Sequence, residues 1–415
     1  MRIAVIVNDF PTLCETFIQN EVTGMIEAGH EVDVLAHTSR EAGEDHPDVA
    51  RYRLRDRVHL LLRPPPSAVA RIAQGARLML RSLPRHPGPL LRSLDVFRHG
   101  RKALSLQLLH LLASFAPRGP YDLIHAQFGP NGELAVLLRH LGLHRGPIVV
   151  SFHGFDASRW VVTHGPGCYE KLFSEDVLVM PVSGYLAGRL EKLGCPSEKI
   201  QIHHTGVKLE EFPLAEREPA VGGPVKLLSI GRFVEKKGLE YGIRAVARVR
   251  RERPDRKIVY RIVGDGELAG DLMRLIERLG LNDCVELLGP RSHREIPSLL
   301  RESDVFLLPS VRSAEGDEEG IPVSLMEAMA TGLPVVSTLH AGIPELVEEG
   351  VSGFLAPERD EETLARRIID LVDHPERWPE MGRQGRRKVE AEHDSDVLND
   401  RLEATYLRLL SGRCA

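Results

Sequence analysis

Short runs of hydrophobic residues alternate with helix-like segments along the whole chain. The runs have little polar alternation, as is typical of parallel strands covered on both faces. Strands separated by helical segments indicate parallel sheets with right-handed crossovers, so the pattern predicts an α/β protein. The expected strands lie near 2–7, 31–36, 122–126, 148–152, 177–182, 200–204, 225–230, 258–263, 285–288, 304–308 and 334–337.

The pattern restarts in the middle of the chain. At 415 residues, the chain is too long for one ordinary core, so two domains are expected. Residues 217–224 are rich in Pro and Gly and predict a linker, after which Val225–Ile230 resembles a new first strand. We expect doubly wound, Rossmann-like domains at 1–215 and 222–390, facing across a cleft. A C-terminal helix at 391–415 is expected to pack back toward the first domain.

Composition narrows the functional classes. Hydrophobic residues make up 42% and charged residues 27%, as in soluble globular proteins, and the net charge of −5 does not favour a nucleic-acid partner. The five cysteines, at 14, 168, 195, 284 and 414, lack metal-ligand spacing, which predicts reduced thiols without zinc. The apolar start is too short for a signal peptide, and no run reaches the ~18 residues that span a bilayer. These features predict a cytoplasmic protein.

One segment, 51–120, has a different character. It holds fourteen Arg and Lys residues but only two acidic residues, with Leu, Val and Ala between them. A basic amphipathic helix pair at about 60–115 would attract an anionic membrane face, which predicts peripheral contact with the inner face of the cell membrane. The alternative is a solvated face whose aliphatic residues pack on the first domain. The sequence leaves both open.

The most informative motif is a pair of glutamates, Glu319 and Glu327, around the turn at 320–323. Pro322 suits the first turn of a helix, and Gly332 suits its end. Glu319 is therefore expected in the loop entering a helix and Glu327 about one turn inside it. An open helix start suits a phosphate, and carboxylates beside such a site need partners of their own. Sugar and ribose hydroxyls are the natural candidates.

A second motif follows the strand at 225–230. The loop Gly231–Gly238 carries two cations, Arg232 and Lys237, that could hold a diphosphate, whereas Lys236 is expected to be a solvated neighbour. The alternative is a basic surface turn. The glycines of Gly264-Asp265-Gly266, at the end of another strand, would let a ligand or another chain segment approach closely, which is a weak signal.

Several polar residues at strand ends of the first domain are candidates for the cleft-facing edge of its sheet. His153 and Asp156 follow the 148–152 strand, and His125 ends the preceding strand. A histidine can donate to a developing charge or a sugar hydroxyl near neutral pH, although a lone histidine is more often structural. Glu15 and Thr16 follow the first strand, where Thr16 also suits a helix N-cap. No Gly-x-Gly-x-x-Gly fingerprint occurs there, which argues against NAD or FAD.

Four segments together resemble the family 4 glycosyltransferases of the GT-B fold. The segments are 10–18, 153–156, 231–238 and 316–322, and they are most similar to the bacterial exopolysaccharide branch that includes the colanic-acid and amylovoran transferases. The resemblance covers nearly the whole chain. It implies an acceptor-binding first domain and a donor-binding second domain. It also implies retaining transfer of a hexose from a UDP- or GDP-sugar to a saccharide or lipid-linked acceptor.

The resemblance also implies residue roles. Arg232 and Lys237 would bind the donor diphosphate, Glu327 the ribose, and His153 and Glu319 would act at the reacting centre. Preorganised positive charge can meet the leaving diphosphate without a metal ion or cofactor, so none is expected. Same-face attack and closure of the cleft on donor binding are also expected. The donor sugar would be held by Glu319, Gly320, Ile321, Pro322 and Val323.

Four rival functions are compatible with the sequence. They are a transferase with a small-molecule acceptor, a nucleotide-sugar epimerase, a sugar phosphorylase carrying pyridoxal phosphate, and a binding module that has lost catalysis. The intact set of Arg232, Lys237, Glu319, Glu327 and His153 argues against the last, because a decayed site would be free to lose its charges.

Overall fold

The computed structural model describes residues 1–12, 15–39, 46–217 and 223–412. Each half of the chain builds one six-stranded parallel sheet, so the expected α/β class with two doubly wound sheets is confirmed. The first sheet has the order β3-β2-β1-β4-β5-β6, and the second β12-β11-β10-β7-β8-β9. The strands are β1 (Arg2–Asp9), β2 (Glu31–Thr38), β3 (Val58–Leu60), β4 (Leu123–Gln127), β5 (Ile148–Phe152), β6 (Leu178–Pro181), β7 (Val225–Ile230), β8 (Ile258–Val263), β9 (Val285–Gly289), β10 (Val305–Leu308), β11 (Val335–Thr338) and β12 (Gly353–Ala356).

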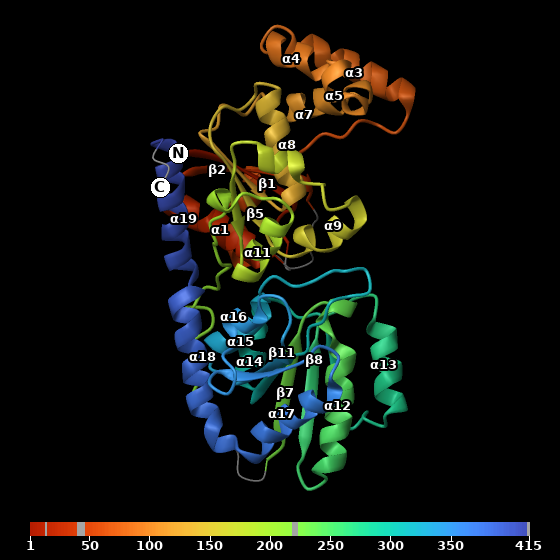
Figure 1. The fold of residues 1–415 in the computed structure, drawn as a ribbon, viewed down its shortest axis with the longest axis vertical. Helices are drawn as coiled ribbons and strands as arrows, with labels where there is room; N and C mark the ends of the chain where they lie inside the picture. The colour runs from red at the N-terminus through yellow and green to blue at the C-terminus, as the bar shows by residue number, and fades with distance from the viewer. Residues whose placement is uncertain (13–14, 40–45, 218–222, 413–415) are drawn as a thin grey trace.

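Helices cover the sheets in both halves (Figure 1). In the first half they are α1 (Thr16–Glu27), α2 (Pro47–Arg51), α3 (Ala68–Ser82), α4 (Pro87–Ser93), α5 (Val96–His99), α6 (Arg101–Leu104), α7 (Gln107–Phe115), α8 (Gly129–His140), α9 (Arg159–His164), α10 (Glu170–Ser174) and α11 (Gly184–Lys192). In the second half they are α12 (Leu239–Glu252), α13 (Ala269–Arg278), α14 (Ile296–Arg301), α15 (Val323–Ala330), α16 (Ile343–Leu346), α17 (Glu361–Asp373), α18 (Trp378–Glu392) and α19 (Ser395–Leu410).

Both faces of each sheet are buried, which explains why the strands lack polar alternation. In β1, Ala4 and Ile6 pack into one core cluster, while Ile3 and Val5 pack into another on the opposite face. Successive side chains of a strand point to opposite faces, so an all-apolar strand serves two cores at once. Such burial of apolar surface is the main favourable contribution to folding.

Strand order decides where a ligand can bind. In the first sheet the order reverses between β1 and β4, and in the second between β7 and β10. Loops leaving neighbouring strands at such a point turn to opposite sides, which opens a crevice at the carboxyl edge. The loop at 231–238 follows β7 and the loop at 309–322 follows β10, so both expected donor motifs start at this crevice.

Two strand predictions differ from the structure. Residues 200–204 do not form a strand: Ile200 makes an isolated bridge to Val179, and the N–H groups of Gln201 and His203 donate to the carbonyls of Val179 and Pro181. Pro181 has no N–H to donate in return, so the ladder is one-sided. The sequence also did not predict β3 and β12, which have three and four residues.

The basic segment forms five helices, α3 to α7, rather than a helix pair, and they project from one end of the molecule (Figure 1). Leu78, Leu90, Leu109 and Leu112 pack together as a small core of this region. Only some of the aliphatic side chains of α3 and α4 therefore pack inside this region, and others are exposed. We call residues 58–115 the helical insert.

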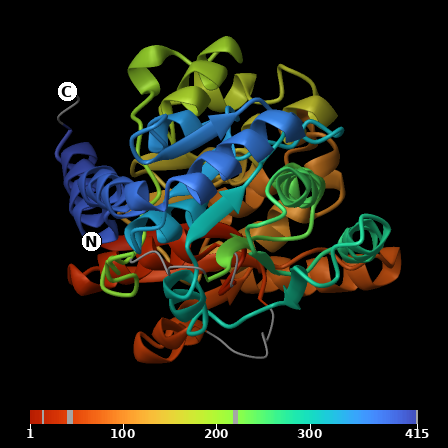
Figure 2. The ribbon, with the colours of Figure 1, turned by 90° about the horizontal axis from the view of Figure 1, so that it is seen from below.

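The last two helices run along one side of the molecule in both views (Figures 1 and 2). Helix α18 packs on α15 in the second half, and α19 packs on α1 in the first half. Leu402 and Tyr406 of α19 belong to the same core cluster as Phe17 and Ile18 of α1. The C-terminal segment thus contacts both halves of the chain.

Several expectations touch residues outside the described ranges. Most of the predicted linker, residues 218–222, lies outside them, as do Cys14 and Cys414. The described cysteines, Cys168, Cys195 and Cys284, are free thiols. Within the described ranges, no helix is both long and apolar enough to cross a membrane.

Candidate active site

The loop after β7 is shaped by glycines on a neighbouring loop. A Cβ on Gly264 would lie 1.9 Å from the carbonyl oxygen of Gly231, and one on Gly266 would lie 2.6 Å from that of Phe233. The N–H of Phe233 donates to the carbonyl of Asp265 at 2.8 Å. Because only glycine permits such an approach, the Gly264–Gly266 turn supports the loop at 231–238 by contact between chain segments.

Lys237 and Glu319 meet across the crevice between β7 and β10. The Nζ of Lys237 lies 2.7 Å from Oε1 of Glu319, whose exposed fraction is 7%. Burial alone would raise the pKa of Glu319, but the ammonium groups of Lys237 and Lys236 lower this pKa to about 2. Glu319 is therefore ionised at neutral pH, and the two charges hold each other in place.

A buried histidine fixes the Glu319 backbone. The N–H of Glu319 donates to Nε2 of His340 at 3.1 Å, and Nδ1 of His340 lies 2.6 Å from Oε1 of Glu358. The carboxylate of Glu358 accepts the Nδ1 proton, which leaves the Nε2 lone pair for the backbone. The sequence did not predict this support; its only local signal was the position of His340 two residues after β11.

Lys236 is buried, and the expectation that it is solvated was wrong. Its exposed fraction is 9%, and its Nζ lies 3.2 Å from Oδ1 of Asp317 and 3.4 Å from the carbonyl oxygen of Glu318. Two adjacent lysines therefore have different surroundings. Lys236 anchors the loop that carries Glu319, while Lys237 contacts the Glu319 carboxylate itself.

Helix α15 begins as the sequence predicted. Pro322 is its N-cap, so Glu319 lies in the entering loop and Glu327 lies inside the helix. The Glu327 side chain is 8% exposed, and no described residue donates a hydrogen bond to it. Burial and the nearby Glu211 charge raise the pKa of Glu327 to about 7, although the opposing influence of His293 lowers it. An uncompensated buried carboxylate is costly unless a ligand supplies donors.

On the other side of the cleft, His153 is held between Phe17 and Phe128, with ring centroids 4.7 and 4.8 Å away. Its Nε2 lies 2.7 Å from Oε1 of Gln127, whose Nε2 donates to Glu21 at 2.6 Å. The Gln127 oxygen accepts, so His153 carries its proton on Nε2 and offers a lone pair at Nδ1. Nδ1 is buried without a hydrogen-bond partner in the described chain. Burial lowers the pKa of His153 to about 3, so the ring is neutral.

The two halves of the chain touch where the loop after β5, which carries His153, meets the loop before α15, which carries Glu319. A Cβ on Gly154 would lie 2.8 Å from the backbone nitrogen of Gly320, and one on Gly320 would lie 2.4 Å from the carbonyl oxygen of His153. Two glycines therefore let the loops pack backbone against backbone. His153 and Glu319, from opposite halves, are therefore carried by two loops that meet at the same junction.

Glu318 joins the two halves at this junction through hydrogen bonds. Its Oε2 accepts hydrogen bonds from Arg189 at 2.5 Å and from the Tyr185 hydroxyl at 2.9 Å, both on α11 of the first half. Glu345 of α16 also accepts from the N–H groups of Gly184 and Tyr185, at 2.8 and 2.7 Å. None of these contacts has a local sequence signature, because each joins residues far apart in the chain.

Two predicted acceptor-side residues are buried instead. Asp156 is 0% exposed and accepts hydrogen bonds at 3.0 Å from the N–H groups of Gly129, His153 and Gly154. Burial raises the pKa of Asp156 to about 6. Its carboxylate shapes the His153 loop, and does not face the cleft.

His125 is also buried. Its ring is 1% exposed, its Nδ1 lies 2.6 Å from the Tyr406 hydroxyl and its Nε2 lies 2.7 Å from Oγ of Ser151. The expectation of a cleft position for His125 is not met, because β4 lies inside the sheet and α19 covers this side chain.

Glu15 and Thr16 lie where α1 begins. Glu15 is the N-cap residue, without a capping side-chain bond among the described residues, so Thr16 does not cap the helix. Burial raises the pKa of Glu15 to about 7, while the positive charge of Arg232 lowers it. The exposed Arg232 of the second half therefore lies close enough to act on a carboxyl of the first half. Thr16 faces a hollow that Glu327 also lines.

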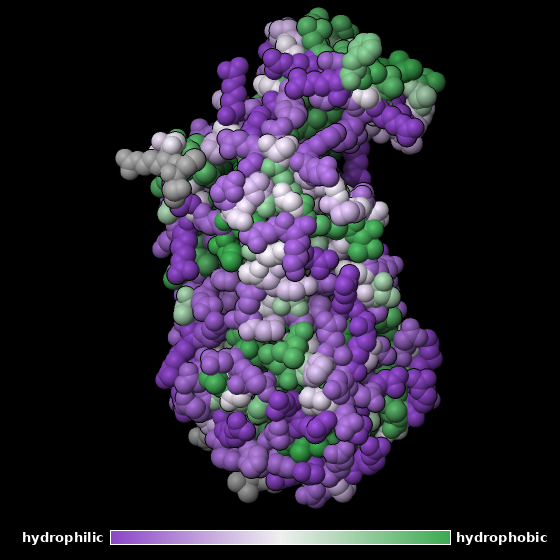
Figure 3. All heavy atoms as spheres, viewed as in Figure 1, coloured by the Kyte–Doolittle hydropathy of each residue, from purple (hydrophilic) through white to green (hydrophobic). Residues whose placement is uncertain are grey.

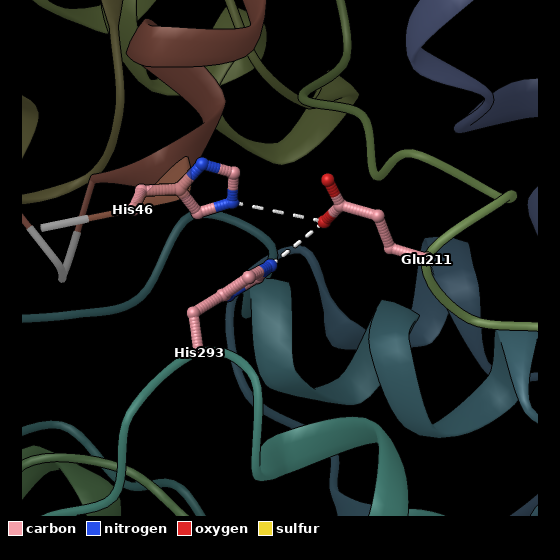
Figure 4. Close-up of side chains that lie close together, drawn as sticks. All are labelled: His46, Glu211 and His293. Atoms are coloured by element: carbon pink, nitrogen blue, oxygen red, sulfur yellow. Dashed lines mark hydrogen bonds and ion pairs between the residues drawn. The ribbon is translucent and has the colours of Figure 1, made fainter. Parts of the chain in front are cut away.

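This hollow lies between the halves and contains residues that the sequence reading did not single out. Three of them, His46, Glu211 and His293, point toward one another (Figure 4). The hollow is lined by Thr16, Asn20, His46, Val207, Lys208, Glu211, Phe212, His293 and Glu327.

Solved structures with this architecture define the class. Anabaena HepE in complex with UDP and glucose matches with a TM-score of 0.69 at 19% identity, covering 98% of this chain and 99% of that one. The sucrose-phosphate synthase of Thermosynechococcus elongatus matches with a TM-score of 0.72 at 18% identity over 100% of both chains. With two parallel sheets and these neighbours, the protein has the GT-B fold.

The sequence comparisons narrow the class to a family. The model described as Glycosyltransferase Family 4 matches residues 14–211, and that described as Glycosyl transferases group 1 matches 213–388. The putative colanic acid biosynthesis glycosyltransferase WcaL of Escherichia coli K12 is 39% identical over 99% of this chain and 100% of its own. The amylovoran biosynthesis glycosyltransferase AmsK of Erwinia amylovora is 36% identical over 99% and 100%. The chain therefore belongs to the family 4 glycosyltransferases and is a glycosyltransferase, as the sequence motifs predicted.

Proposed function

We propose that the protein transfers a hexose from a UDP- or GDP-sugar to a saccharide acceptor, with retention of configuration, in exopolysaccharide biosynthesis. The names of WcaL and AmsK, for colanic acid and amylovoran biosynthesis, support the pathway class. The observation that carries the proposal is the Lys237–Glu319 pair beside the junction with the His153 loop.

Positive charge at the crevice supports the roles of Arg232 and Lys237. Departure of a nucleotide diphosphate leaves negative charge, which Arg232, Lys237 and the start of α15 can stabilise by preorganised electrostatics. The Glu319 carboxylate keeps the Lys237 ammonium in one position before the donor binds. This arrangement can stabilise the leaving group without a metal ion or cofactor.

The two glutamates suit different hydroxyls of the donor. Glu319 is ionised and fixed, so it can accept hydrogen bonds from the transferred sugar, together with the backbone of 320–323. Glu327 lacks a described donor, and the ribose hydroxyls would supply two. Donor binding would then lower the free-energy cost of keeping Glu327 ionised inside the protein.

His153 suits a role at the reacting centre as a neutral acceptor. Its unpartnered Nδ1 can accept a hydrogen bond from a sugar hydroxyl, while Gln127 holds the other nitrogen. Glu319 is engaged by Lys237, which makes it a poor nucleophile for a double displacement. We therefore favour same-face attack, with the leaving phosphate taking the acceptor proton. A glycosyl adduct trapped on Glu319 would contradict this mechanism.

The helical insert supports a lipid-linked acceptor at an anionic membrane. Val69, Ile72 and Leu80 of α3 are 79%, 68% and 75% exposed, and Phe97 of α5 is fully exposed. Hydrophobic residues gather over α3 and α4 at the end of the molecule (Figure 3). Exposed arginines lie on or between the same helices: Arg77, Arg81, Arg85, Arg92 and Arg98. Apolar side chains among cations fit the boundary between acyl chains and anionic headgroups.

The donor is tested first by thermal unfolding with a panel of UDP- and GDP-sugars, since a ligand that binds the folded state raises the melting temperature. Turnover is then compared between wild type, Arg232→Ala and Lys237→Ala. Each loss of a charge stabiliser should reduce kcat by roughly 10²–10³. The controls Arg256→Ala and Lys257→Ala remove exposed cations before β8, at the opposite edge of the sheet, and should keep full turnover.

The same assay separates the rivals. Release of an altered nucleotide sugar without acceptor would identify an epimerase, and an absorbing pyridoxal group with phosphate-dependent turnover would identify a phosphorylase. Full activity of Arg232→Ala and Lys237→Ala would refute the assignment of the diphosphate site.

A further inference from the structure

Two histidines and a glutamate from three separate parts of the chain meet beside Glu327. His46 is the N-cap of α2 in the first half, and His293 lies between β9 and α14 in the second half. Glu211 belongs to the segment 205–212, which leads from the first half to the second. Figure 4 shows the three side chains pointing toward one another from these segments.

The separations between the three groups suit a shared central atom. Nε2 of His293 lies 2.7 Å from Oε2 of Glu211, and Nε2 of His46 lies 3.8 Å from the same oxygen. One ligand atom from each residue lies within 4.8 Å of the other two. Around a tetrahedral ion with bonds of about 2.0–2.2 Å, ligand atoms are about 3.3–3.6 Å apart. Small side-chain shifts would therefore reach that geometry.

The hollow has an excess of negative charge when its imidazoles are neutral. Besides Glu211, it is lined by the Glu327 carboxyl, and Asp48 stands behind His46 with Lys208 as its ion-pair partner. Lys208 offsets one of these three carboxylates. His46 and Asp48 are 4% exposed, so solvent screens these charges weakly. A divalent cation would compensate the Glu211 carboxylate and the ionised form of Glu327.

We propose that His46, Glu211 and His293 form a binding site for a divalent transition-metal ion of the zinc type. Each histidine supplies Nε2 and Glu211 supplies a carboxylate oxygen. A mixed set of two imidazoles and one carboxylate selects zinc or a similar ion, whereas Mg²⁺ and Ca²⁺ prefer oxygen ligands alone. A fourth position remains for water or for the Glu327 carboxylate, which lines the same hollow.

Metal binding requires both rings to carry their proton on Nδ1. At present His46 Nδ1 accepts from the N–H of Asp48 at 3.2 Å, and Oδ2 of Asp48 lies 3.7 Å from the same nitrogen. In the metal-bound form that carboxylate would accept the Nδ1 proton of His46. A carboxylate behind a metal-binding histidine orients the ring and raises its basicity.

The ion would link the two halves of the chain beside Glu327. Its ligands come from the first half, the connecting segment and the second half, so binding would favour the folded arrangement in which all three meet. The reaction proposed above needs no such ion, and the only residue that this site shares with the proposed donor site is Glu327, which lines the same hollow.

The test is direct binding of Zn²⁺ to chelator-treated protein without nucleotide, measured by calorimetry, with Mg²⁺ as the comparison. We expect one equivalent of Zn²⁺ to bind and to raise the melting temperature, and Mg²⁺ to do neither. His46→Gln and His293→Gln should each weaken Zn²⁺ affinity by at least about tenfold. The matched control is His374→Gln, which removes an exposed histidine that also lies beside a glutamate, Glu376, at 3.0 Å.

A second measurement on the wild type avoids dependence on variant folding. Co²⁺ added in place of Zn²⁺ should give visible absorption bands of a four- or five-coordinate site, and one equivalent of Zn²⁺ should abolish them. Equal Zn²⁺ affinity in wild type and both cluster variants, or no Zn²⁺-displaceable Co²⁺ spectrum, would overturn the proposal and leave a hydrogen-bonded histidine–carboxylate cluster only. Neither readout depends on sugar transfer, so failure here leaves the proposed function untouched.

Discussion

At the residue scale, the two glutamates of one motif have opposite electrostatic surroundings. Lys237 and Lys236 lower the pKa of Glu319 to about 2, against the effect of burial. Burial raises the pKa of Glu327 to about 7, since the nearby Glu211 carboxylate adds to that effect and His293 only partly opposes it. Glu319 is ready to act as a carboxylate, whereas Glu327 is half protonated near neutral pH. The difference comes from neighbours, not from the residue type.

Replacement of Glu327 by Gln should make stability less dependent on pH. A carboxyl whose pKa is raised on folding, from about 4.3 to about 7, contributes full stability below the unfolded pKa and loses it as pH rises through 7. At pH 8 this loss is on the order of 3 kcal/mol. The melting temperature of Glu327→Gln relative to wild type should therefore rise between pH 5 and pH 8.

The control for this experiment is Glu277→Gln, an exposed glutamate on α13. Its stability should stay within about 0.5 kcal/mol of wild type at both pH values. If the melting temperature of Glu327→Gln equals that of wild type at both pH 5 and pH 8, the assignment of an uncompensated buried carboxylate is contradicted. If Glu327 also binds the ribose, the same variant should bind the donor more weakly while being more stable.

Replacement of Glu319 by Gln should reduce both activity and stability. The variant keeps the shape of the side chain but leaves the Lys237 ammonium, whose side chain is 13% exposed, without its partner. Loss of one member of a buried pair costs about 3–5 kcal/mol, and kcat should fall by roughly 10²–10³. Thermal unfolding and turnover measure the two effects separately. Wild-type values for both would exclude a central role for the pair.

At the element scale, the site depends on loops that pack backbone against backbone. Gly154 has φ +131°, and an added Cβ would lie 2.8–3.0 Å from backbone atoms of Glu318, Glu319 and Gly320. Gly165 also has a positive φ, +88°, but no atom of the described residues, its chain neighbours aside, lies within 4 Å of its added Cβ. Alanine variants at these two positions therefore distinguish the effect of backbone strain from the effect of contact between the halves.

Gly154→Ala should reduce turnover by at least about tenfold, because displacements near 1 Å at a reacting centre have effects of that size or larger. Gly165→Ala carries only the strain of a positive φ and should keep near-wild-type turnover. The measurement is kcat for both variants after circular dichroism has confirmed folding. Equal turnover of the two variants would show that the loop contact does not position the site.

Helix α19 offers a second test at this scale. Leu402 is 0% exposed and packs with the core of the first half, while Leu407 on the same helix is 50% exposed. Leu402→Ala should destabilise the protein by about 2–5 kcal/mol, since it leaves a cavity, and Leu407→Ala by less than about 0.5 kcal/mol. Chemical denaturation measures both. Similar values would contradict the docking of α19 on α1.

At the scale of the whole molecule, the helical insert places an apolar and basic surface at one end of the protein (Figures 1 and 3). We expect the protein to co-sediment with vesicles containing anionic lipid and much less with neutral vesicles, because each basic residue near the surface contributes about 1 kcal/mol. The binding should weaken at high salt. Ile72→Asp with Leu80→Asp should reduce it, as both side chains are more than half exposed.

The control for the vesicle experiment is Met273→Asp on α13, which changes a side chain that is 57% exposed in the second half. It should sediment with anionic vesicles as wild type does. Retention of full binding by the insert double variant, or equal binding to neutral and anionic vesicles, would count against membrane contact through α3.

The sequence predicted much of the architecture because its signals were local. Strands such as β5, β7 and β8 were located to the residue, since a continuous apolar run marks a parallel strand buried on both faces. The start of α15 was predicted from Pro322 alone. The predictions failed where pairing decided the outcome: residues 200–204 had the composition of a strand but lacked a reciprocal partner opposite Pro181.

For the candidate site, the sequence determined which residue types follow the carboxyl ends of the strands. The loops that carry Lys237 and Glu319 could therefore be identified from the sequence. Only the tertiary structure distinguished His153 from His125. Both were expected at strand ends, but His125 lies inside β4 and a tyrosine 281 positions away covers it, while the Nδ1 of His153 stays without a partner in the described chain. Likewise, only the tertiary structure shows that His46, Glu211 and His293 lie close together. Local sequence fixes backbone preferences over a few residues, whereas burial, pairing and pKa depend on groups that folding brings together from distant parts of the chain.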